Sequence, residues 1–359
     1  MALHFKIVPH VLQFSFVAGT SRGSFTEKET WWIKVFDPIK PEVVGWGEAS
    51  PLKGLSPDYS SDFGSVLNGH LNNIELDITD LTHPDEILAL VQNRIPSAFP
   101  TIRFALETAL LDLHYGGLRK IFDNKFWHGK MNIPINGLIW MGDLDFMQQQ
   151  MTQKLEEGFK TIKMKIGAIQ FEQELNLLKE IRSRYSPDEV TLRVDANGAF
   201  GLDDAEKKLS QLAELDIHSI EQPVATGQKE LMQKLCKDQV LPIALDEELI
   251  GVYHRHDKAQ LLDDIQPQYI ILKPSLLGGI SSCQEWIALA EERGMGWWFT
   301  SMLESNIGLN AIAQLTAEYQ PELPQGLGTG QLYHNNLNSP LSIRNGELQY
   351  DLDKHWGTF

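Results

Sequence analysis

Residues 161–198 read TIKMKIGAIQFEQELNLLKEIRSRYSPDEVTLRVDANG. This stretch begins with a short apolar strand segment, TIKMKIG, continues in a helical pattern and ends with a second strand segment, TLRVDANG. Each segment carries a charged residue, Lys165 or Asp195, where the strand gives way to a loop. Strands that alternate with helices at this spacing are typical of a parallel sheet covered by helices.

The same unit recurs on both sides of this stretch. INGLIW precedes it, and HSIEQPV, PIALDEE, YIILKPS, GWWFTSMLES and PQGLGTG follow it, which makes eight strand segments. From the second segment on, a polar or special residue ends each one, at intervals of 25 to 30 residues: Lys165, Asp195, Glu221, Asp246, Lys273, Ser301 and Gly328. The pattern predicts an α/β fold, with a (β/α)8-type barrel over residues 126–330. An open doubly wound sheet is the alternative, but it usually has fewer strands and needs a glycine-rich phosphate turn after its first strand, which this sequence lacks.

Residues 1–125 follow a different pattern, in which strands come first and helices follow. The β-rich segments are 3–16, 30–37 and 43–51. A buried helical stripe runs over 101–115 and ends at two glycines. This order predicts an N-terminal α+β unit.

Two further segments connect to this unit. The polar segment 18–29 is too long for a tight hairpin, so we expect it to form a flap between the first two strands. The last segment, 331–359, is predicted to form a hairpin or extended chain that returns to the N-terminal unit.

Composition limits the class of partner. The 359 residues predict about two domains at roughly 150 residues each. The net charge is −17, which disfavours binding to nucleic acid or anionic membranes, and no uncharged apolar run approaches the ~20 residues of a membrane span. The N-terminus does not resemble a signal peptide. Two distant cysteines, Cys236 and Cys283, favour a reducing, cytoplasmic location over a disulfide or zinc framework.

Carboxylates end three consecutive strand segments, at Asp195, Glu221 and Asp246. The active sites of barrels lie at the C-terminal ends of the strands, and three acids there repel one another unless a cation lies between them. A donor set made only of oxygen favours Mg²⁺. Each acid alone could form a salt bridge or a helix cap, but three in register favour a metal site.

Lysines flank these acids on both sides. Lys163 and Lys165 lie on one face of their strand because side chains alternate, and Lys273 ends the sixth segment. A lysine near a metal and another lysine is expected to have a lowered pKa and to act as a base. Because a metal makes the carbon beside a bound carboxylate acidic, the residues predict proton abstraction α to a carboxylate. The alternative for Lys273 is a Schiff-base lysine, which needs no site of three carboxylates.

The motifs K-x-K, D-x-N, E-Q-P, D-E and K-P, in this order and spacing, resemble the muconate-lactonising subgroup of the enolase superfamily. FALETALLDL and GWGEASPL resemble the capping domain of that superfamily, so the resemblance covers essentially the whole chain and implies a capping domain over 1–125. TSMLESNIGLNAIAQL and GLGTG resemble the branch of the subgroup that dehydrates a succinylated cyclohexadiene carboxylate in menaquinone biosynthesis. The superfamily uses a lysine or histidine base together with Mg²⁺.

The resemblance implies roles for the residues at the strand ends. Asp195, Glu221 and Asp246 would bind Mg²⁺, with Mn²⁺ as a substitute. Lys165 would remove the α-proton and then protonate the departing hydroxyl in a syn elimination. Lys163 would lower the pKa of that lysine, and Lys273 would stabilise the dianion from the other face.

Three neighbouring residues are candidates for supporting roles. Arg193 shares a strand face with Asp195 and is expected to steer the substrate or to form an ion pair inside the barrel. Asn197 is expected to support the metal site or to form the turn before Gly198. Glu247 has the opposite parity to Asp246, so we expect an indirect or packing role.

Candidate substrate contacts lie on three loops. Ser301 and the backbone amides of Gly328 and Thr329 are expected to hold the succinyl carboxylate. Alternatively, the Ser301 segment forms a tight turn in which Ser305 caps the next helix. Arg22 is expected to close over the substrate or to remain solvated.

Sister activities of the subgroup remain open. N-succinylamino acid racemases share the succinyl group, and muconate cycloisomerases need only a small diacid. Dipeptide epimerases that bind an α-ammonium group need acids after the eighth strand, and GLGTGQLYHNN contains none. A metal-binding protein without catalysis would leave the inward lysines unexplained. The expected partner is a small-molecule carboxylate, and the sequence does not predict the oligomeric state.

Overall fold

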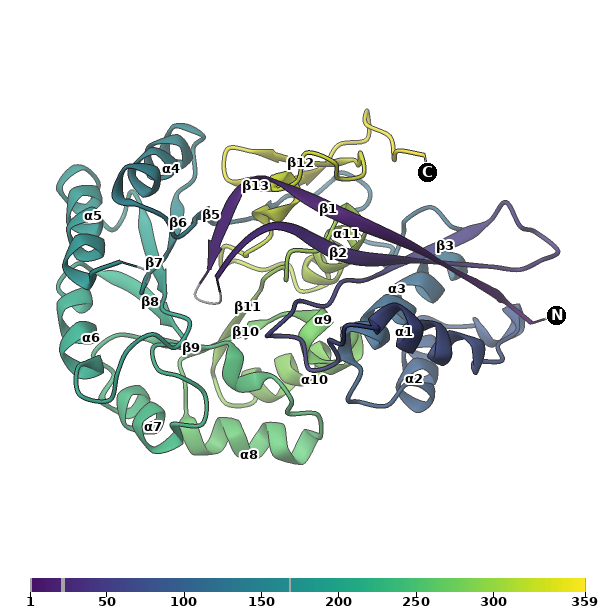
Figure 1. The fold of residues 1–359 in the computed structure, drawn as a ribbon, viewed down its shortest axis with the longest axis horizontal. Coiled ribbons are helices and arrows are strands. Elements are labelled where there is room, and N and C mark those ends of the chain that lie inside the picture. Colours follow the sequence, from purple (N-terminus) through teal and green to yellow (C-terminus); the bar gives the residue numbers. More distant parts are fainter. Residues whose placement is uncertain (1, 21–22, 168, 359) are drawn as a thin grey trace.

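The computed structural model describes residues 2–20, 23–167 and 169–358. Its N-terminal part is an antiparallel sheet of three strands packed against three helices (Figure 1). These elements are β1 (His4–Thr20), β2 (Gly23–Phe36), β3 (Val44–Ala49), α1 (Phe63–Asn72), α2 (Pro84–Arg94) and α3 (Pro100–His114). The predicted helix at 101–115 is α3. It packs closely on β3 because Gly47 has no side chain: a Cβ there would lie 1.9 Å from the carbonyl oxygen of Ala105.

A curled parallel sheet of seven strands forms the second part, with helices on its outer face (Figure 1). The strands are β5 (Gly137–Ile139), β6 (Thr161–Lys165), β7 (Thr191–Asp195), β8 (Ile217–Glu221), β9 (Ile243–Leu245), β10 (Tyr269–Leu272) and β11 (Gly296–Phe299). The helices are α4 (Leu144–Glu156), α5 (Phe171–Arg184), α6 (Ala205–Ala213), α7 (Lys229–Asp238), α8 (Arg255–Ile265), α9 (Pro274–Leu277), α10 (Gly279–Glu291) and α11 (Asn306–Glu318). In α5, for example, Leu175, Leu178 and Ile181 recur at helical spacing and are buried. The sheet follows chain order from β5 to β11, as the prediction of a barrel requires.

The eighth segment closes the ring without forming a regular strand. Gln325 forms a parallel bridge to Ile135, and Gly326 forms one to Thr300. The N–H of Gly326 also donates to the carbonyl oxygen of Phe299 at 2.8 Å. The barrel is confirmed, but the prediction of a full eighth strand at PQGLGTG is wrong. Proline and glycine disfavour a ladder there, and residues 328–331 form a short 3₁₀ helix, η3 (Gly328–Gln331).

The predicted flap at 18–29 is wrong in its conformation. β1 and β2 continue through most of this segment as one long hairpin, with pairs such as Ala18–Phe25. Backbone bonds tie β1 to the chain that follows η3: the N–H of Ser15 donates to the Leu332 carbonyl at 2.8 Å, and His334 donates to Gln13 at 3.1 Å. Within the segment 18–29, Gly19 forms an antiparallel bridge to Met141, and this tertiary pairing stabilises strand structure where the composition favours a loop.

The C-terminal residues also form a hairpin, of β12 (Leu341–Arg344) and β13 (Glu347–Tyr350). β13 pairs with β4 (Ile133–Pro134), which lies just before the barrel. Beyond this hairpin, the guanidinium of Arg119 lies 5.7 Å from the ring of Trp356. The end of the chain therefore contacts the segment that connects α3 to the barrel.

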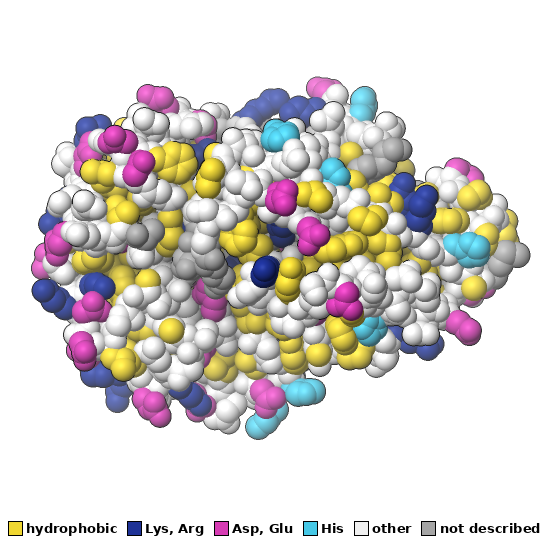
Figure 2. All heavy atoms as spheres, in the orientation of Figure 1, with side chains coloured by type: hydrophobic (Ala, Val, Ile, Leu, Met, Phe, Trp, Pro, Cys, Tyr) yellow, Lys and Arg dark blue, Asp and Glu magenta, His cyan; other side chains and the backbone are white. Residues whose placement is uncertain are grey.

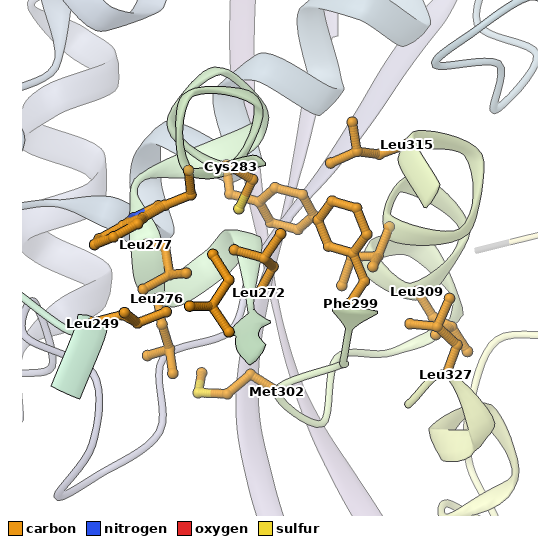
Figure 3. Packing of buried hydrophobic residues seen from close by; sticks show 14 of the residues in the cluster. Leu249, Leu272, Leu276, Leu277, Cys283, Phe299, Met302, Leu309, Leu315 and Leu327 are labelled. Atoms are coloured by element: carbon orange, nitrogen blue, oxygen red, sulfur yellow. The ribbon is translucent and has the colours of Figure 1, made fainter. Parts of the chain in front are cut away.

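The main hydrophobic core continues through both parts of the molecule. Figure 3 shows a portion in which Leu272 of β10, Cys283 of α10 and Phe299 of β11 gather between the sheet and its helices. On the face in Figure 2, acidic and basic side chains are scattered rather than collected in one charged patch. None of the helices in the described part of the chain is long and apolar enough to cross a membrane.

Candidate active site

A cavity of about 380 Å³ lies at the C-terminal ends of the barrel strands. Phe16 of the β1–β2 hairpin forms part of its wall, so the N-terminal part of the chain helps to enclose it. Its polar lining includes Lys163, Lys165, Asp195, Glu221 and Lys273. The cavity therefore collects all three predicted lysines and two of the three predicted acids.

Strand register places the three acids side by side. Asp195 pairs with Glu221 across β7 and β8, and Glu221 pairs with Ala244 of β9. Asp246 lies two residues after Ala244 and so points to the same side of the sheet. Each of the three carboxylates is at most 2% exposed. Asp246 lies beside the cavity lining, where it pairs with Lys273.

The other two lysines also contact the acids directly. The Nζ of Lys163 lies 3.0 Å from Oδ2 of Asp195 and 2.6 Å from Oε2 of Glu221. The Nζ of Lys165 lies 3.1 Å from Oδ2 of Asp195 and donates to Oδ1 of Asn197 at 2.9 Å. These contacts fix the ammonium group of Lys165 at the edge of the carboxylate cluster.

The surrounding carboxylates shift the pKa values of two lysines. Burial lowers the pKa of Lys163, but the carboxylates of Asp195 and Glu221 outweigh burial and raise it. The pKa of Lys273 is also raised, because Asp246 and Glu221 outweigh burial. The nearby carboxylates therefore dominate the pKa of both lysines, and the lowered pKa expected for a lysine beside a bound metal stays a prediction.

The acids are shifted in opposite directions. Burial and the charge of Asp195 raise the pKa of Glu221 to about 8, against the opposing effect of Lys163. Burial also acts to raise the pKa of Asp195, but Lys163 and Lys165 hold it below its ordinary value. The cluster thus keeps Asp195 ionised and makes Glu221 hard to ionise without additional positive charge.

The donor chemistry of this cluster fits a hard divalent cation. Its ligands are carboxylate oxygens, and Oε1 of Glu221 is buried with no hydrogen-bond partner among the described residues. No group of three acidic, histidine or cysteine side chains in the described ranges already has the arrangement of a metal site. The ammonium group of Lys163 lies between the carboxylates of Asp195 and Glu221 instead.

Three residues around the acids act as supports. Asn197, with φ +43, forms a turn and donates from Nδ2 to Oε1 of Glu247 at 3.0 Å. The sequence analysis missed Gln222, whose Oε1 accepts the N–H of Asp246 at 3.2 Å. The E-Q-P motif contained this signal, but only its glutamate was used.

Arg193 is not among the described residues that line the cavity, so its role in steering substrate stays a prediction. It lies two residues before Asp195, about 7 Å deeper in the barrel, and is 2% exposed. Its guanidinium stacks 4.1 Å from the ring of Trp298 and donates to the Pro324 carbonyl at 2.7 Å. Among the described residues the alternative of an ion pair is not formed either, and the guanidinium contacts the ring of Trp298 and the Pro324 carbonyl.

Ser301 lines the cavity, but its hydroxyl forms hydrogen bonds within its own loop. Its Oγ donates to Oε2 of Glu304 at 2.6 Å and accepts the N–H of Leu303 at 3.0 Å. Ser305 caps α11 by accepting the N–H of Ile307. The structure therefore shows the tight turn that the sequence analysis kept as an alternative.

Unpaired polar atoms mark another part of the cavity. Gly328 and Thr329 line it as predicted, and Oγ1 of Thr329 is buried with no partner among the described residues. Oδ1 of Asn136, which the sequence analysis missed, is also buried with no partner among the described residues. Nothing in the local sequence around INGLIW distinguishes this asparagine from a turn residue. Arg22 lies outside the described residues.

An apolar wall was also missed by the sequence analysis. It consists of Phe16, Leu138, Trp140, Phe146 and Leu332, all of which line the cavity and belong to one cluster apart from the main core. The rings of Phe16 and Trp140 lie 5.8 Å apart, edge to face. The wall comes from distant parts of the chain, so no local pattern could indicate it.

Comparison with known proteins identifies relatives of the whole chain. The family described as Enolase C-terminal domain-like matches residues 147–353. An o-succinylbenzoate synthase of Desulfotalea psychrophila is 47% identical over 357 residues, covering 94% of this chain and 96% of the relative. A crystal structure of MenC from the same organism has a TM-score of 0.86 at 42% identity and covers 97% of this chain and 100% of that one. An N-succinylamino acid racemase of Amycolatopsis is 25% identical over 342 residues, covering 91% and 87%.

Proposed function

This chain belongs to the enolase superfamily, whose members use a divalent metal, and from that premise we propose that it is an o-succinylbenzoate synthase. The reaction is the dehydration of 2-succinyl-6-hydroxy-2,4-cyclohexadiene-1-carboxylate to 2-succinylbenzoate, a step of menaquinone biosynthesis. The relative of Desulfotalea psychrophila carries that name. A soluble small-molecule enzyme of the cytoplasm fits this proposal.

The proposed reaction breaks one C–H and one C–O bond. The electron pair of the C–H bond α to the carboxylate forms the new C=C bond, and the hydroxyl leaves as water after protonation. Both steps are on the same face, so one base can serve both, first as acceptor and then as donor. The ring becomes aromatic, which drives the elimination.

Lys165 is the proposed base. Its Nζ borders the cavity and is fixed by Asp195 and Asn197, which positions it for proton transfer. Lys273 faces the same cavity from the far side of the barrel mouth, four strands along the sheet from Lys165. It would stabilise negative charge on the substrate carboxylate. Lys163 would hold the carboxylate cluster and the substrate carboxylate from below.

Asp195, Glu221 and Asp246 would hold the metal, Mg²⁺ with Mn²⁺ as a substitute. When bound, the ion supplies positive charge that stabilises the substrate carboxylate as the α-proton leaves. Gly328 and Thr329 are the proposed contacts of the succinyl carboxylate. A ring with an apolar body suits the wall of aromatic and leucine side chains that lines the rest of the cavity.

The observation that carries the proposal is the placement of Lys165 and Lys273 on one cavity, with the acids between them and an apolar wall opposite. The described lining contains only two carboxylates, Asp195 and Glu221, and both lie in the lysine cluster. An α-ammonium group would have no acid elsewhere in the cavity to pair with, which disfavours dipeptides.

N-succinylamino acid racemisation is the second candidate. It needs a base on each face of the α-carbon, and lysines on opposite sides of the cavity satisfy that need. The 25% identical relative carries that activity in its name. Muconate cycloisomerisation has no observation in its favour beyond the shared subgroup.

A direct assay tests the proposal. Purified protein with Mg²⁺ should convert the cyclohexadiene to 2-succinylbenzoate, followed by loss of the diene absorbance. Parallel incubations should contain N-succinylamino acids of each hand and a dipeptide. Turnover of the amino acids without dehydration would replace the first choice by the second.

A further inference from the structure

Lys28 of β2 is almost completely buried, with 4% exposure, although lysine is among the residue types least often buried. Its ammonium group has three acceptors. Nζ donates to Oγ of Ser50 at 2.6 Å, to the carbonyl oxygen of Met302 at 2.8 Å and to that of Leu303 at 2.9 Å. All three of its N–H bonds are therefore used, and two go to one short loop.

That loop forms part of the cavity wall. Ser301, Met302 and Leu303 line the cavity, whereas Lys28 is absent from the described lining and lies behind them. Leu303 has a φ of +64, a left-handed conformation that is strained for a leucine. Two successive carbonyl groups turn toward one ammonium group here, so their repulsion is offset by a positive charge.

A second donor acts on the same carbonyl. The hydroxyl of Tyr333 donates to the Leu303 oxygen at 2.8 Å, and this tyrosine is also absent from the described lining of the cavity. On the other side of the loop, Glu304 accepts from Ser301 and from the N–H of Met302 at 2.7 Å. The backbone of the wall is thus held from behind by named side chains.

A neighbouring side chain on the same face of β2 forms a buried hydrogen bond that does not involve the wall carbonyls. Thr30 donates to Oε1 of Glu48 at 2.9 Å, and Glu48 in turn accepts the N–H groups of Ser305 and Gly308 at the start of α11. Thr30 is fully buried, as Lys28 nearly is. It therefore provides a matched control for loss of a buried side-chain hydrogen bond of β2 that does not involve the cavity wall.

We propose that Lys28 is a positioning residue for substrate binding: from the N-terminal part of the chain, its ammonium group holds the Met302 and Leu303 carbonyls and so sets the shape of one wall of the substrate cavity. The inference rests on the proposed function only in assuming that this cavity binds the substrate.

The first test compares three variants in the dehydration assay. Lys28→Met keeps the length of the side chain but removes the charge, and should raise KM about tenfold with a smaller change in kcat, because the wall binds substrate and transition state alike. Tyr333→Phe removes the second donor to Leu303 and should change KM in the same direction by less. Thr30→Val should leave KM within about twofold of wild type.

A second measurement does not depend on the substrate. Hydrogen exchange of the peptide that spans 301–305 should be faster in Lys28→Met than in wild type or Thr30→Val, because the amides of Met302 and Leu303 are protected only while the loop keeps its shape. Lys28→Arg keeps the charge and should recover part of the protection. If Lys28→Met is too unstable for kinetics, hydrogen exchange at 301–305 still tests how the wall is held. Tyr333→Phe is then compared with Thr30→Val.

The outcomes separate this inference from the proposed function. Unchanged exchange at 301–305 and unchanged KM in Lys28→Met would overturn the role of Lys28. Equal effects of Lys28→Met and Thr30→Val would also overturn it, because they would indicate general docking of β2. If wild type does not dehydrate the diene, the proposed function fails, and the exchange experiment still decides on Lys28.

Discussion

Glu107 lies on α3 with no exposed surface, and its Oε2 accepts the N–H of Ile280 at the start of α10. Burial raises its pKa from 4.5 to about 8. Between these two values the unfolded chain releases a proton that the folded protein keeps. The free energy of unfolding therefore falls as pH rises from 4.5 to 8, and the contribution is fully present only below 4.5.

The matched variant is Glu107→Gln, which has no proton to lose. From pH 5 to pH 8, wild type should lose stability relative to Glu107→Gln by up to about 1.4 kcal/mol per pH unit. Urea unfolding at four pH values measures the difference, and the other titrating carboxyls cancel in the comparison. Parallel stability curves for the two proteins would contradict the shifted pKa.

Lys165 and Lys273 should respond differently to substitution. Lys165→Ala removes the proposed base and should lower the rate of dehydration by at least about 10²–10⁴-fold. Lys273→Arg keeps the positive charge but is a very poor acid or base, so a dehydratase should keep part of its activity. Rate measurements on both variants with the cyclohexadiene check this.

The racemase alternative makes the opposite prediction. There each lysine must exchange a proton, so Lys273→Arg should be almost inactive. In D₂O, wild type would also exchange the α-proton of both enantiomers of an N-succinylamino acid as fast as it dehydrates. That result would remove our first choice.

At the scale of elements, α11 depends on a residue from the other part of the chain. Glu48 of β3 accepts the backbone N–H groups of Ser305 and Gly308, each at 2.8 Å, and the Ser305 hydroxyl at 2.5 Å. These are donors at a helix N-terminus, where a carboxylate is favourable. One side chain therefore caps the helix and joins the N-terminal sheet to the barrel.

Glu48→Ala should lower the free energy of unfolding by about 3 kcal/mol, because it leaves several buried donors without a partner. Glu48→Gln keeps one acceptor oxygen and should lose less. Chemical denaturation measures both, with Thr30→Val as a control that removes only one donor to Glu48. A loss below about 0.5 kcal/mol in Glu48→Ala would contradict the cap.

Local patterns predicted the elements well where each could be recognised alone. Lys165, Asp195, Glu221 and Asp246 recur at strand ends, and the period of strand and helix indicated the barrel. The hairpin through 18–29 was not predictable, because its pairing is completed by a bridge from Gly19 to Met141, which is distant in sequence. The eighth segment was overestimated because closure needs only bridges at Gln325 and Gly326.

For the candidate site, the chemical type of the residues was more predictable than which of them lie at the cavity. Charged residues at strand ends indicated the lysine and carboxylate cluster, since parity alone decides which side they face. The alternation of side chains does not give their depth along the barrel axis. Arg193 was therefore expected at the cavity, although it lies deeper inside the barrel. The apolar wall and Lys28 depend on contacts between segments far apart in sequence, for which a single chain carries no local signal.

At the scale of the whole molecule, the fold should not depend on the metal. The acids that would bind it already have ammonium partners: Lys163 and Lys165 for Asp195, Lys163 for Glu221 and Lys273 for Asp246. Excess chelator should therefore abolish turnover while the near-UV circular dichroism spectrum and the cooperative thermal transition remain. Metal at one hundred times its Kd should add about 2.7 kcal/mol to the free energy of unfolding.

Asp195→Asn serves as the companion variant for that experiment. It should lose activity, and added metal should raise its melting temperature less than that of wild type. Full turnover in excess chelator would refute the metal assignment.

The contact between Lys28 and the cavity wall also has a consequence in time. The carbonyl groups that receive its ammonium group belong to residues 274 and 275 positions later in the chain. Translation adds about 5 to 20 residues per second, so the ribosome makes Lys28 about 14 to 55 seconds before its partners. Through that interval the lysine stays hydrated on an incomplete nascent chain, and its burial must be among the last events in the maturation of the protein.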